Sequence, residues 1–424
     1  MATDVLADVD VLVVGAGAAG IAAARALQGQ GLRLLLLEAR DRPGGRAWTD
    51  SESLGSPFDH GATWLHDADH NPLRALAETH GFALIDSDAV RQEITFQGER
   101  RLDGPALRAW DAAWRAFEAR IHARAAHPGP DIPASEAAPR PGPYEASIAY
   151  WQGEIIAAAP LAEISLHDFA ATLLPGRNML PEAGLGTLLA HTAQGLPIAY
   201  GAAVTRLAWG GDGVVAEGAF GRIRARGAIL TLPTSLIAAE AIRFDPPLPA
   251  ETLQAASDLP MGAGVKVALR AAGEDRLGLA PFTSIDRVIA PGETMITLRA
   301  WPFGRDHLIG HVGGPHAAAL DAAGPAALHD AVMAEIVRCF GAEARRAFRP
   351  GAVTTTWLRD PWTRGLYTHA KPGAAGARAI LARPLTEGRL CFAGEACHPT
   401  LAGTVGGAWL SGEAAAATVR RAIA

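Results

Sequence analysis

The chain has 424 residues, which at about 150 residues per domain is enough for two or three domains with cores of their own. Hydrophobic residues make up 49% and charged residues 19%, which excludes disorder or a coiled coil as a description of the whole chain. The net charge of −6 argues against a surface for nucleic acid.

The longest apolar stretch runs from Val11 to Ala24 and contains three glycines, so it is too short and too interrupted to cross a bilayer. The first ten residues carry acids and no basic segment of the kind that opens a secretory signal. The three cysteines show no paired spacing, which is typical of a reducing compartment. We therefore expect a cytoplasmic protein without a membrane partner.

A β-branched apolar run at 9–14 leads into the glycine-rich segment GAGAAG, followed by a helix-period segment that ends near residue 31. A second apolar run covers 32–39. Strand, glycine turn, helix and strand in this order predict a βαβ unit and a buried parallel sheet.

The middle of the chain alternates between helical and extended patterns. Apolar residues three and four apart predict a helix over 105–124, and helical patterning returns over 148–174. Between them, 127–145 hold six prolines and predict an irregular surface loop. Short apolar runs predict strands at 198–232, in a small antiparallel layer that returns to the main sheet, and at 260–312.

The last part of the chain predicts a helix at 325–340, then a strand, a loop and a long alanine-rich helix. His66 and His70 are four residues apart, but Asn71 and Pro72 interrupt any helix there, so we expect no metal site.

The strongest chemical signal is Gly15-x-Gly17-x-x-Gly20 between a strand and a helix, with Glu38 at the end of the next strand. The first glycine permits the turn, the second lets a diphosphate approach the backbone, and the third lets helix and strand pack. Glu38 would accept hydrogen bonds from the ribose of a dinucleotide. A second glycine pair with Arg46 follows and adds donors for the same diphosphate. NAD and FAD both remain open at this point.

Further segments carry a resemblance to a known family. They include LLLEARDRPGGRAWT, FDHGATWLHDADHNPL, MGAGVKVAL, WLRDPWTRGLYTHAKPG and CFAGEACHPTLAGTVGGAWLSGEAAAA, which run from near the N-terminus to the last helix. In this set and order the sequence resembles the FAD-dependent amine oxidase family, which includes monoamine oxidases, polyamine oxidases and flavin lysine demethylases. The resemblance implies an α/β, two-domain flavoprotein with a Rossmann-type FAD-binding domain and an α+β substrate domain.

The resemblance divides the chain into a discontinuous FAD-binding domain, 1–80, 176–248 and 352–424, and a substrate-binding domain, 81–175 and 249–351. It implies non-covalent FAD, because Leu366 stands where monoamine oxidases have the cysteine that bonds the flavin. The cofactor-binding residues it implies are Gly15, Gly17, Ala18, Gly20, Glu38, Ala39, Arg40, Gly45, Arg46, Gly61, Ala62, Thr63, Trp64, Val204, Trp357, Gly394, Glu395, Thr404 and Val405.

Lysine occurs only at Lys266 and Lys371. Lys266 lies on the opposite face of a strand from Val265 and Val267, and it is either a solvated edge lysine or a cavity group with a shifted pKa. The resemblance favours the second interpretation and places this lysine, through a water, at flavin N5.

The resemblance implies that Trp357 and Tyr367 form the aromatic walls of an amine site, although most residues of this kind pack in a protein core. Thr404 takes the place of a second aromatic residue, which argues against a two-tyrosine sandwich. His66 matches the histidine of the polyamine oxidase channel and would bind or deprotonate an ammonium.

The expected reaction is oxidation of an amine by hydride transfer from its α-carbon to flavin N5, which gives an imine, then an aldehyde, and hydrogen peroxide. The expected partners are a small amine and oxygen, and a homo-oligomer is left open. The alternatives are an L-amino-acid oxidase, for which the sequence offers no assignable carboxylate-binding arginine, a flavin desaturase, and a flavin-bound sensor or interaction protein without turnover.

Overall fold

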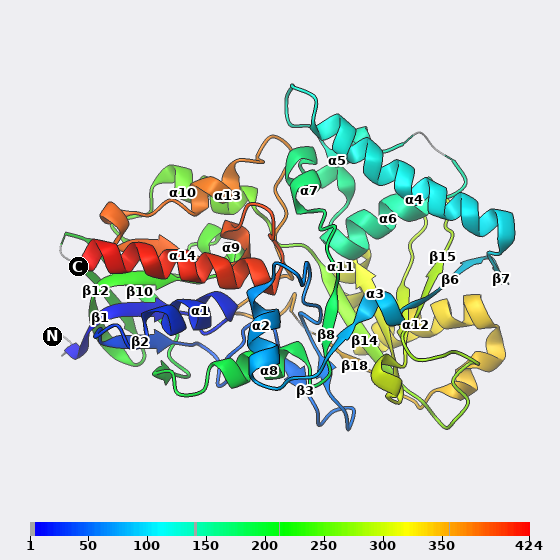
Figure 1. Cartoon of the computed structure of the whole chain (residues 1–424), viewed down its shortest axis with the longest axis horizontal. Coiled ribbons are helices and arrows are strands. Elements are labelled where there is room, and N and C mark those ends of the chain that lie inside the picture. The colour runs from blue at the N-terminus through cyan, green and yellow to red at the C-terminus, as the bar shows by residue number, and fades with distance from the viewer. Residues whose placement is uncertain (1–4, 140–141, 212, 356) are drawn as a thin grey trace.

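The computed structural model describes residues 5–139, 142–211, 213–355 and 357–424. Within these residues the chain forms two large sheets, one of eight strands and one of seven, with helices packed against both. Figure 1 shows the two sheets in neighbouring lobes, and the ends of the chain both lie in the lobe of the eight-stranded sheet. The mixed α/β class expected from the sequence is confirmed.

The eight-stranded sheet contains the predicted βαβ unit. Strand β1 pairs in parallel with β2 and with β12, and helix α1 (Ala18–Leu27) connects β1 to β2. The order is β13 (Arg243–Asp245), β10 (Val204–Gly210), β11 (Gly213–Gly218), β12 (Gly221–Leu230), β1 (Val5–Val14), β2 (Leu34–Leu37) and β9 (Ile198–Ala199), with β19 (Leu390–Phe392) also on β12. The expected antiparallel layer is β10, β11 and β12, which returns to the main sheet beside β1.

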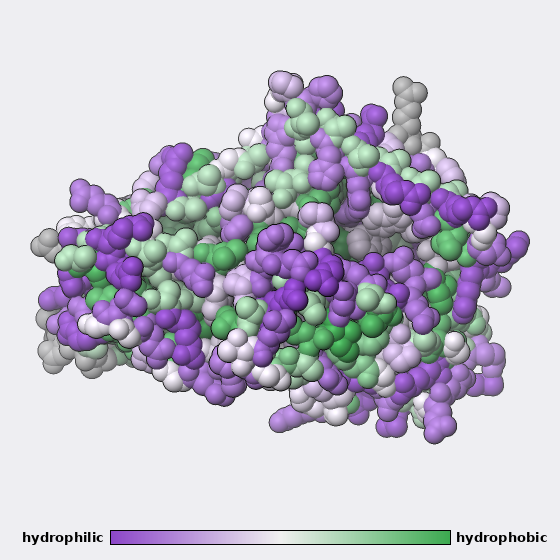
Figure 2. Space-filling model, in the orientation of Figure 1, coloured by the Kyte–Doolittle hydropathy of each residue, from purple (hydrophilic) through white to green (hydrophobic). Residues whose placement is uncertain are grey.

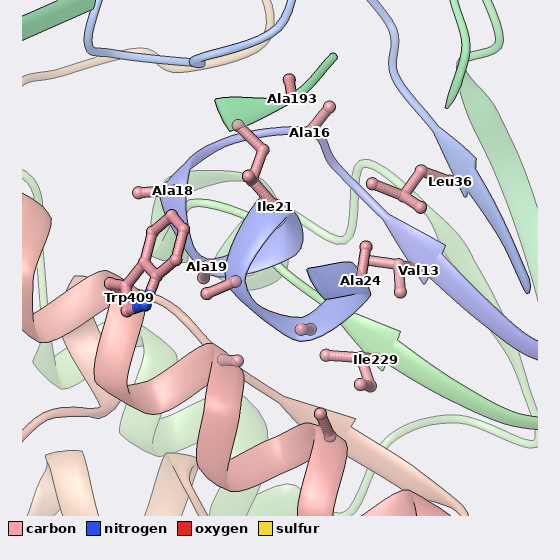
Figure 3. Packing of buried hydrophobic residues seen from close by; sticks show 14 of the residues in the cluster. Val13, Ala16, Ala18, Ala19, Ile21, Ala24, Leu36, Ala193, Ile229 and Trp409 are labelled. Carbon is pink, nitrogen blue, oxygen red and sulfur yellow. The ribbon is translucent and has the colours of Figure 1, made fainter. Parts of the chain in front are cut away.

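Burial on both faces explains the continuous apolar run in β1. Val11 and Val13 point into the core beneath α1 and α14 (Val405–Ile423), whereas Leu12 and Val14 point into the core on the opposite face. That second core includes residues of α9 (Thr234–Ala238), α10 (Ala250–Asp258) and α13 (Ala377–Leu381). In Figure 3, Trp409 of α14 lies against Ala18 and Ala19 of α1. A strand covered on both faces has no polar alternation to display.

The seven-stranded sheet has one apolar and one polar face. Its order is β18 (Val353–Thr354), β14 (Gly264–Arg270), β17 (His307–Gly313), β16 (Thr297–Ala300), β15 (Thr283–Arg287), β6 (Gln92–Gln97) and β7 (Arg100–Arg101). Val265, Val267 and Leu269 join a core with α12 (Pro325–Phe340), and α11 (Gly314–Ala323) contributes Ala317 to the same core. The alternate residues of these strands, Lys266 among them, face the other way.

A group of helices covers the polar face of this sheet, and two expectations fail here. The segment 127–145 is not simply a surface loop, because Ala134, Ala137 and Tyr144 are buried against α4 (Gly104–Ala125); residues 140–141 lie outside the described chain. The predicted helical stretch 148–174 is broken, since glycine and proline residues interrupt it. Its pieces are α6 (Glu145–Tyr150), the π-helix η1 (Trp151–Ala157), the 3-10 turn η2 (Leu161–Glu163) and α7 (Leu166–Thr172).

Shorter elements complete the two lobes. They are β3 (Thr49–Asp50) with β4 (Phe58–Asp59), β5 (Leu84–Asp86) with β8 (Met179–Pro181), and α2 (Pro72–Thr79), α3 (Ser87–Val90), α5 (Ala134–Ala137) and α8 (Leu185–Thr192). The remaining 3-10 turns are η3 (Pro302–Gly304), η4 (Ala342–Ala347), η5 (Thr386–Gly388) and η6 (Glu395–Cys397). Hydrophilic side chains cover much of the face in Figure 2, and none of the described helices has the length and apolar character needed to cross a membrane.

Candidate active site

One cavity of about 1290 Å³ extends from the glycine turn after β1 to the polar face of the seven-stranded sheet. Pockets for small ligands commonly measure roughly 300–1,000 Å³, so this cavity can hold a dinucleotide together with a second molecule. Of the residues proposed from the sequence to bind the cofactor or substrate, all line the cavity except Gly20.

The first glycine turn is built as the motif requires. Gly15 has a φ of +101°, and a side chain there would run into Thr231. A side chain at Gly20 would collide with the carbonyl oxygen of Gly15, so Gly20 permits the close contact between α1 and the turn. A Cβ at Gly17 would meet no atom within 4 Å, because this position opens into the cavity at the start of α1. A diphosphate fits against the backbone here.

Glu38 fixes the turn as well as lining the cavity. The Glu38 side chain is 4% exposed, and its carboxylate accepts hydrogen bonds from the amides of Ala16 (2.8 Å) and Arg40 (2.9 Å). The second glycine pair docks on the first turn, since the amide of Gly44 donates to the carbonyl of Ala16 (2.8 Å). The Arg40 guanidinium pairs with Asp360 at 2.5 Å, so its charge is already balanced.

Arg46 and Glu395, expected at the same cofactor, contact each other at 2.9 Å. Glu395 also accepts a hydrogen bond from the Thr368 hydroxyl (2.7 Å) and from the Gly403 amide (3.0 Å). Burial alone would raise the pKa of Glu395, but Arg46, Arg378 and these hydrogen bonds hold it below its usual value. Glu395 is therefore a buried anion that organises the loop before α14.

Helix α14 directs its N-terminus into the cavity. Thr404 caps it, because its hydroxyl accepts from the Gly407 amide (3.0 Å) and donates to the Leu401 carbonyl (2.7 Å). Val405 begins the helix, and Val204 at the start of β10 and Gly394 line other parts of the wall. The positive end of the helix dipole suits a ligand atom that gains negative charge.

Lys266 lies across the cavity on β14. Its ammonium donates to the carbonyls of Asp59 (2.9 Å) and Gly61 (2.5 Å) and to the Thr63 hydroxyl (2.5 Å). Burial lowers its pKa to about 8, and the nearby Asp59 carboxylate limits the shift. The expected cofactor-binding segment from Gly61 through Ala62 to Trp64 thus surrounds the Lys266 ammonium, and the centre of the Trp64 ring lies 5.9 Å from it.

The expected aromatic residues line the same region. The Trp357 indole is 6% exposed and donates to the carbonyl of His60 (2.8 Å), so it is held rigidly. The Tyr367 hydroxyl donates to the carbonyl of Ile156 in the π-helix (2.6 Å), which joins the loop between β18 and α13 to the helices over the cavity. Burial raises the pKa of Tyr367, which keeps the phenol protonated.

His66 and His70 have different surroundings. The Nδ1 atom of His66 lies 2.7 Å from the Asn178 side-chain oxygen, and burial lowers the pKa of His66, so its ring is neutral near pH 7. The Asn178 amide donates in turn to Asp88, which assigns its oxygen to His66 and leaves the histidine Nε2 as an acceptor. His70 is exposed and contacts Asp67.

Several cavity residues were missed by the sequence analysis. They lie on the polar face of the seven-stranded sheet and include Ser284, Asp286, Thr297, Arg299 and His311. The signal was present, because each alternates with buried apolar residues in segments such as TSIDR and TLRA. The sequence pattern could not predict how these strands pair, and it is this pairing that brings the five residues together on one face.

The expected cofactor fits this site. Gly17 leaves room for a diphosphate, Glu38 lies beyond it, and the N-termini of α1 and α14 both open into the cavity. These are the groups that a long, doubly anionic dinucleotide requires.

Comparison with known proteins agrees with this fit. The chain is 25% identical over 451 residues to human lysine-specific histone demethylase 2, an alignment that covers 95% of this chain and 52% of the demethylase. It is 27% identical over 460 residues to rice polyamine oxidase 4, covering 97% of this chain and 89% of that protein. The chain thus spans about half the length of the demethylases that it matches.

Among solved structures, putrescine oxidase bound to putrescine superposes with a TM-score of 0.80 at 20% identity, covering 98% of this chain and 99% of that one. At this identity the likeness shows the fold. Residues 18–136 and 143–420 match the profile of flavin containing amine oxidoreductases. This match extends over most of the chain, which therefore belongs to the family of flavin-containing amine oxidoreductases.

Proposed function

We propose that the protein is an FAD-dependent amine oxidase that acts on a small amine. The bound flavin would accept a hydride from the amine's α-carbon, so that amine, oxygen and water become aldehyde, ammonia and hydrogen peroxide. The observation that carries this proposal is the continuity of the cavity, which joins the dinucleotide turn to Lys266, the aromatic pair and the polar sheet face.

The residues proposed to act on the substrate position it and hold charge. Trp357 and Tyr367 are fixed by hydrogen bonds to backbone carbonyls, so their rings can orient an amine without losing further side-chain entropy. The amine must be neutral when hydride leaves its α-carbon, because only a free lone pair stabilises the cation that develops. The neutral His66 can accept a hydrogen bond from that amine.

We propose that FAD is held without a covalent bond. Leu366 offers no nucleophile. Cys397 packs against the core of the eight-stranded sheet, and burial raises the pKa of its thiol to about 12, so it is not a thiolate at neutral pH. Acid precipitation of the purified yellow protein should release all of the flavin into the supernatant. Colour that stays with the pellet would contradict this part of the proposal.

The proposed cofactor domain keeps the division 1–80, 176–248 and 352–424, and the proposed substrate domain keeps 81–175 and 249–351. Two elements pack outside the domain to which their residues are assigned. Helix α10 lies in the proposed substrate domain but packs in the core of the eight-stranded sheet, and β18 lies in the proposed cofactor domain but pairs with the seven-stranded sheet. A cytoplasmic location and a small amine as partner remain part of the proposal.

A second candidate is oxidation of an amino acid at its α-carbon. One observation favours it, namely that Arg299 lines the cavity and could receive a carboxylate. Under this alternative the reacting carbon is bonded directly to the carboxylate, so it would have to reach the flavin while the carboxylate contacts Arg299.

The deciding experiment is a panel of amines and amino acids added anaerobically to the purified holoprotein, followed by peroxide detection in air. Stoichiometric bleaching of the flavin by an amine, with peroxide on reoxidation, is the expected result. Failure of every amine to bleach a correctly loaded flavin would overturn the proposal in favour of a flavin-binding protein without turnover.

A further inference from the structure

The polar face of the seven-stranded sheet forms the floor of the cavity beyond Lys266. The register sets Lys266 opposite His311, His311 opposite Thr297, and Ser284 opposite Arg299. Because β15 and β16 are antiparallel, Asp286 lies diagonally across from Arg299 on the same face. The floor therefore carries one acid and one base at the end that is farther from Lys266.

Asp286 and Arg299 attract each other as opposite charges, and both residues are only partly buried because they face the cavity. Among the described residues, neither Asp286 nor Arg299 forms a direct ion pair, and the only hydrogen bond of the Arg299 side chain is to the carbonyl of Leu298 (3.1 Å). The Asp286 Oδ1 atom, the Trp151 indole nitrogen and the Thr297 hydroxyl are buried without a hydrogen bond of good geometry, although the indole is close enough to Asp286 to lower the pKa of its carboxyl. Groups like these in a cavity wall are arranged for a ligand.

The charged and titratable groups beside the floor are already paired or neutral. Glu93, on the neighbouring strand β6, is largely exposed and pairs with Arg91 at 2.8 Å. The adjacent His311 is neutral, because burial lowers its pKa well below the usual value. Burial raises the pKa of Asp286 and lowers that of Arg299, and their mutual attraction opposes both shifts. A ligand with both charges would offset the desolvation cost that remains.

We infer that the Asp286–Arg299 end of the cavity binds the far end of the substrate, and that this end carries both an ammonium and a carboxylate. The inference rests on the proposed amine oxidase function. The substrate class is then an ω-amino compound with an amino-acid head, whose terminal amine reaches the flavin. Asp286 receives the head's ammonium, Arg299 receives its carboxylate, and the Trp151 indole adds a donor.

The spacing of the strands sets the length of this substrate. Asp286 on β15 is separated from Lys266 on β14 by β16 and β17. Adjacent strands are about 4.8 Å apart, which puts their backbones roughly 14 Å apart. A flexible chain of several methylenes spans the space between the two side chains, whereas an α-amine, which shares its carbon with the carboxylate, does not.

Four compounds with the same five-carbon spacer test the inference on the unmodified holoenzyme. They are 1-aminopentane, 1,5-diaminopentane, 6-aminohexanoate and L-lysine, whose far ends are neutral, cationic, anionic and zwitterionic. We expect kcat/KM for L-lysine to exceed that of each other compound at least tenfold. Equal values for aminopentane and lysine, or a preference for the diamine, would overturn the inference while leaving the amine oxidase proposal intact.

Two variants test which residue binds which charge of the substrate's far end. D286N should lower kcat/KM at least tenfold for lysine and the diamine, and R299M should do so for lysine and 6-aminohexanoate. For each variant, the loss of kcat/KM for aminopentane, which has no charge at its far end, should be at least threefold smaller than the loss for lysine. The matched controls D330N and R346K replace exposed residues and should behave as the unmodified enzyme. Equal losses on all four compounds would mean that Asp286 and Arg299 only support the sheet, which contradicts the inference.

The site of oxidation separates this inference from the amino-acid oxidase alternative. Deuterium at the ε-carbon of lysine should give a primary isotope effect on flavin reduction, and deuterium at the α-carbon should give none. An effect from the α-carbon would overturn the inference. If no compound reduces the flavin, the amine oxidase proposal fails, and stabilisation of the holoprotein against heating by lysine, lost in D286N, still decides whether the floor binds a zwitterion.

Discussion

At the scale of single residues, Lys266 is the side chain whose ordinary chemistry is most altered by its surroundings. Its ammonium is enclosed by carbonyl oxygens, a hydroxyl and the Trp64 ring, and burial brings its pKa to about 8. The group is therefore a cation in neutral solution that can be discharged by mild alkali, which an arginine at this position could not be.

Replacing Lys266 should slow the reaction with oxygen more than the reaction with amine. A buried positive charge stabilises the negative charge that oxygen gains as it takes up electrons, whereas hydride release from a neutral amine needs no cation. In K266M we expect the second-order rate constant for reoxidation to fall at least tenfold, and the anaerobic reduction rate to change less than threefold. Stopped-flow absorbance measures both, and equal losses would refute this role.

The same residue predicts a pH dependence. Lys266 is protonated below its pKa of about 8 and loses its charge as the pH rises through that value. Reoxidation should therefore be fast at pH 7 and should decline to a lower plateau above pH 9, a decline of about tenfold. In K266M the reoxidation rate should not change between these pH values, and a decline of the same size in the variant would assign the titration to another group.

His66 gives a second residue-scale prediction. Its ring is neutral, is oriented by Asn178 and lines the cavity, so it can accept one hydrogen bond from a bound amine. The variant H66F keeps an aromatic ring without the acceptor and should lower kcat/KM about tenfold, as expected for one hydrogen bond of about 1.4 kcal/mol. FAD affinity, measured by fluorescence titration, should stay within twofold; an unchanged kcat/KM would make His66 a packing residue.

At the scale of elements, the glycines in the turn between β1 and α1 have different roles, one in cofactor binding and one in folding. Gly17 opens into the cavity, whereas Gly20 touches the backbone of Gly15. G17A should raise the dissociation constant for FAD at least tenfold and change the unfolding free energy of the FAD-free chain by less than about 0.5 kcal/mol.

G20A, the matched variant, should destabilise the FAD-free chain by about 1–3 kcal/mol, because its methyl group cannot fit against the Gly15 carbonyl. Urea unfolding and FAD titration of both variants measure the difference. Similar losses of stability in the two variants would show that Gly17 also serves packing.

The elements that the sequence predicts well are those whose pattern is local. Residues 325–340 form α12 as expected, because caps and a three-to-four spacing specify a helix within the segment itself. The floor of the cavity was missed for the opposite reason. Asp286 and Arg299 are 13 positions apart, and only the pairing of β15 with β16 makes them neighbours. Prolines likewise predicted a loop at 127–145, but the burial of Ala134 and Tyr144 is set by α4.

At the scale of the whole molecule, a line of buried polar groups along the cavity wall joins the two lobes. Asp168 of α7 forms a bidentate pair with Arg378 of α13, at 2.6 and 2.8 Å. Arg378 also donates to the Thr368 hydroxyl (2.8 Å), which donates to Glu395. Phe169, next to Asp168, packs with α4, whereas Ala377, next to Arg378, packs in the core of the eight-stranded sheet. Through Thr368, the Asp168–Arg378 pair therefore connects the helices over the cavity to Glu395 in the loop before α14.

Breaking this pair should lower the unfolding free energy more than either glycine substitution in the turn between β1 and α1. In R378M the Asp168 carboxylate stays buried without its cation, which costs about 3–5 kcal/mol of unfolding free energy. The double variant D168L/R378M removes both charges and should recover at least half of that loss, although the Ala370 amide then loses its acceptor. Urea unfolding of the FAD-free chains measures these differences. If the double variant is no more stable than R378M, the pair holds the lobes together by its hydrogen bonds rather than by compensating buried charge. Both variants should then also bind FAD equally weakly.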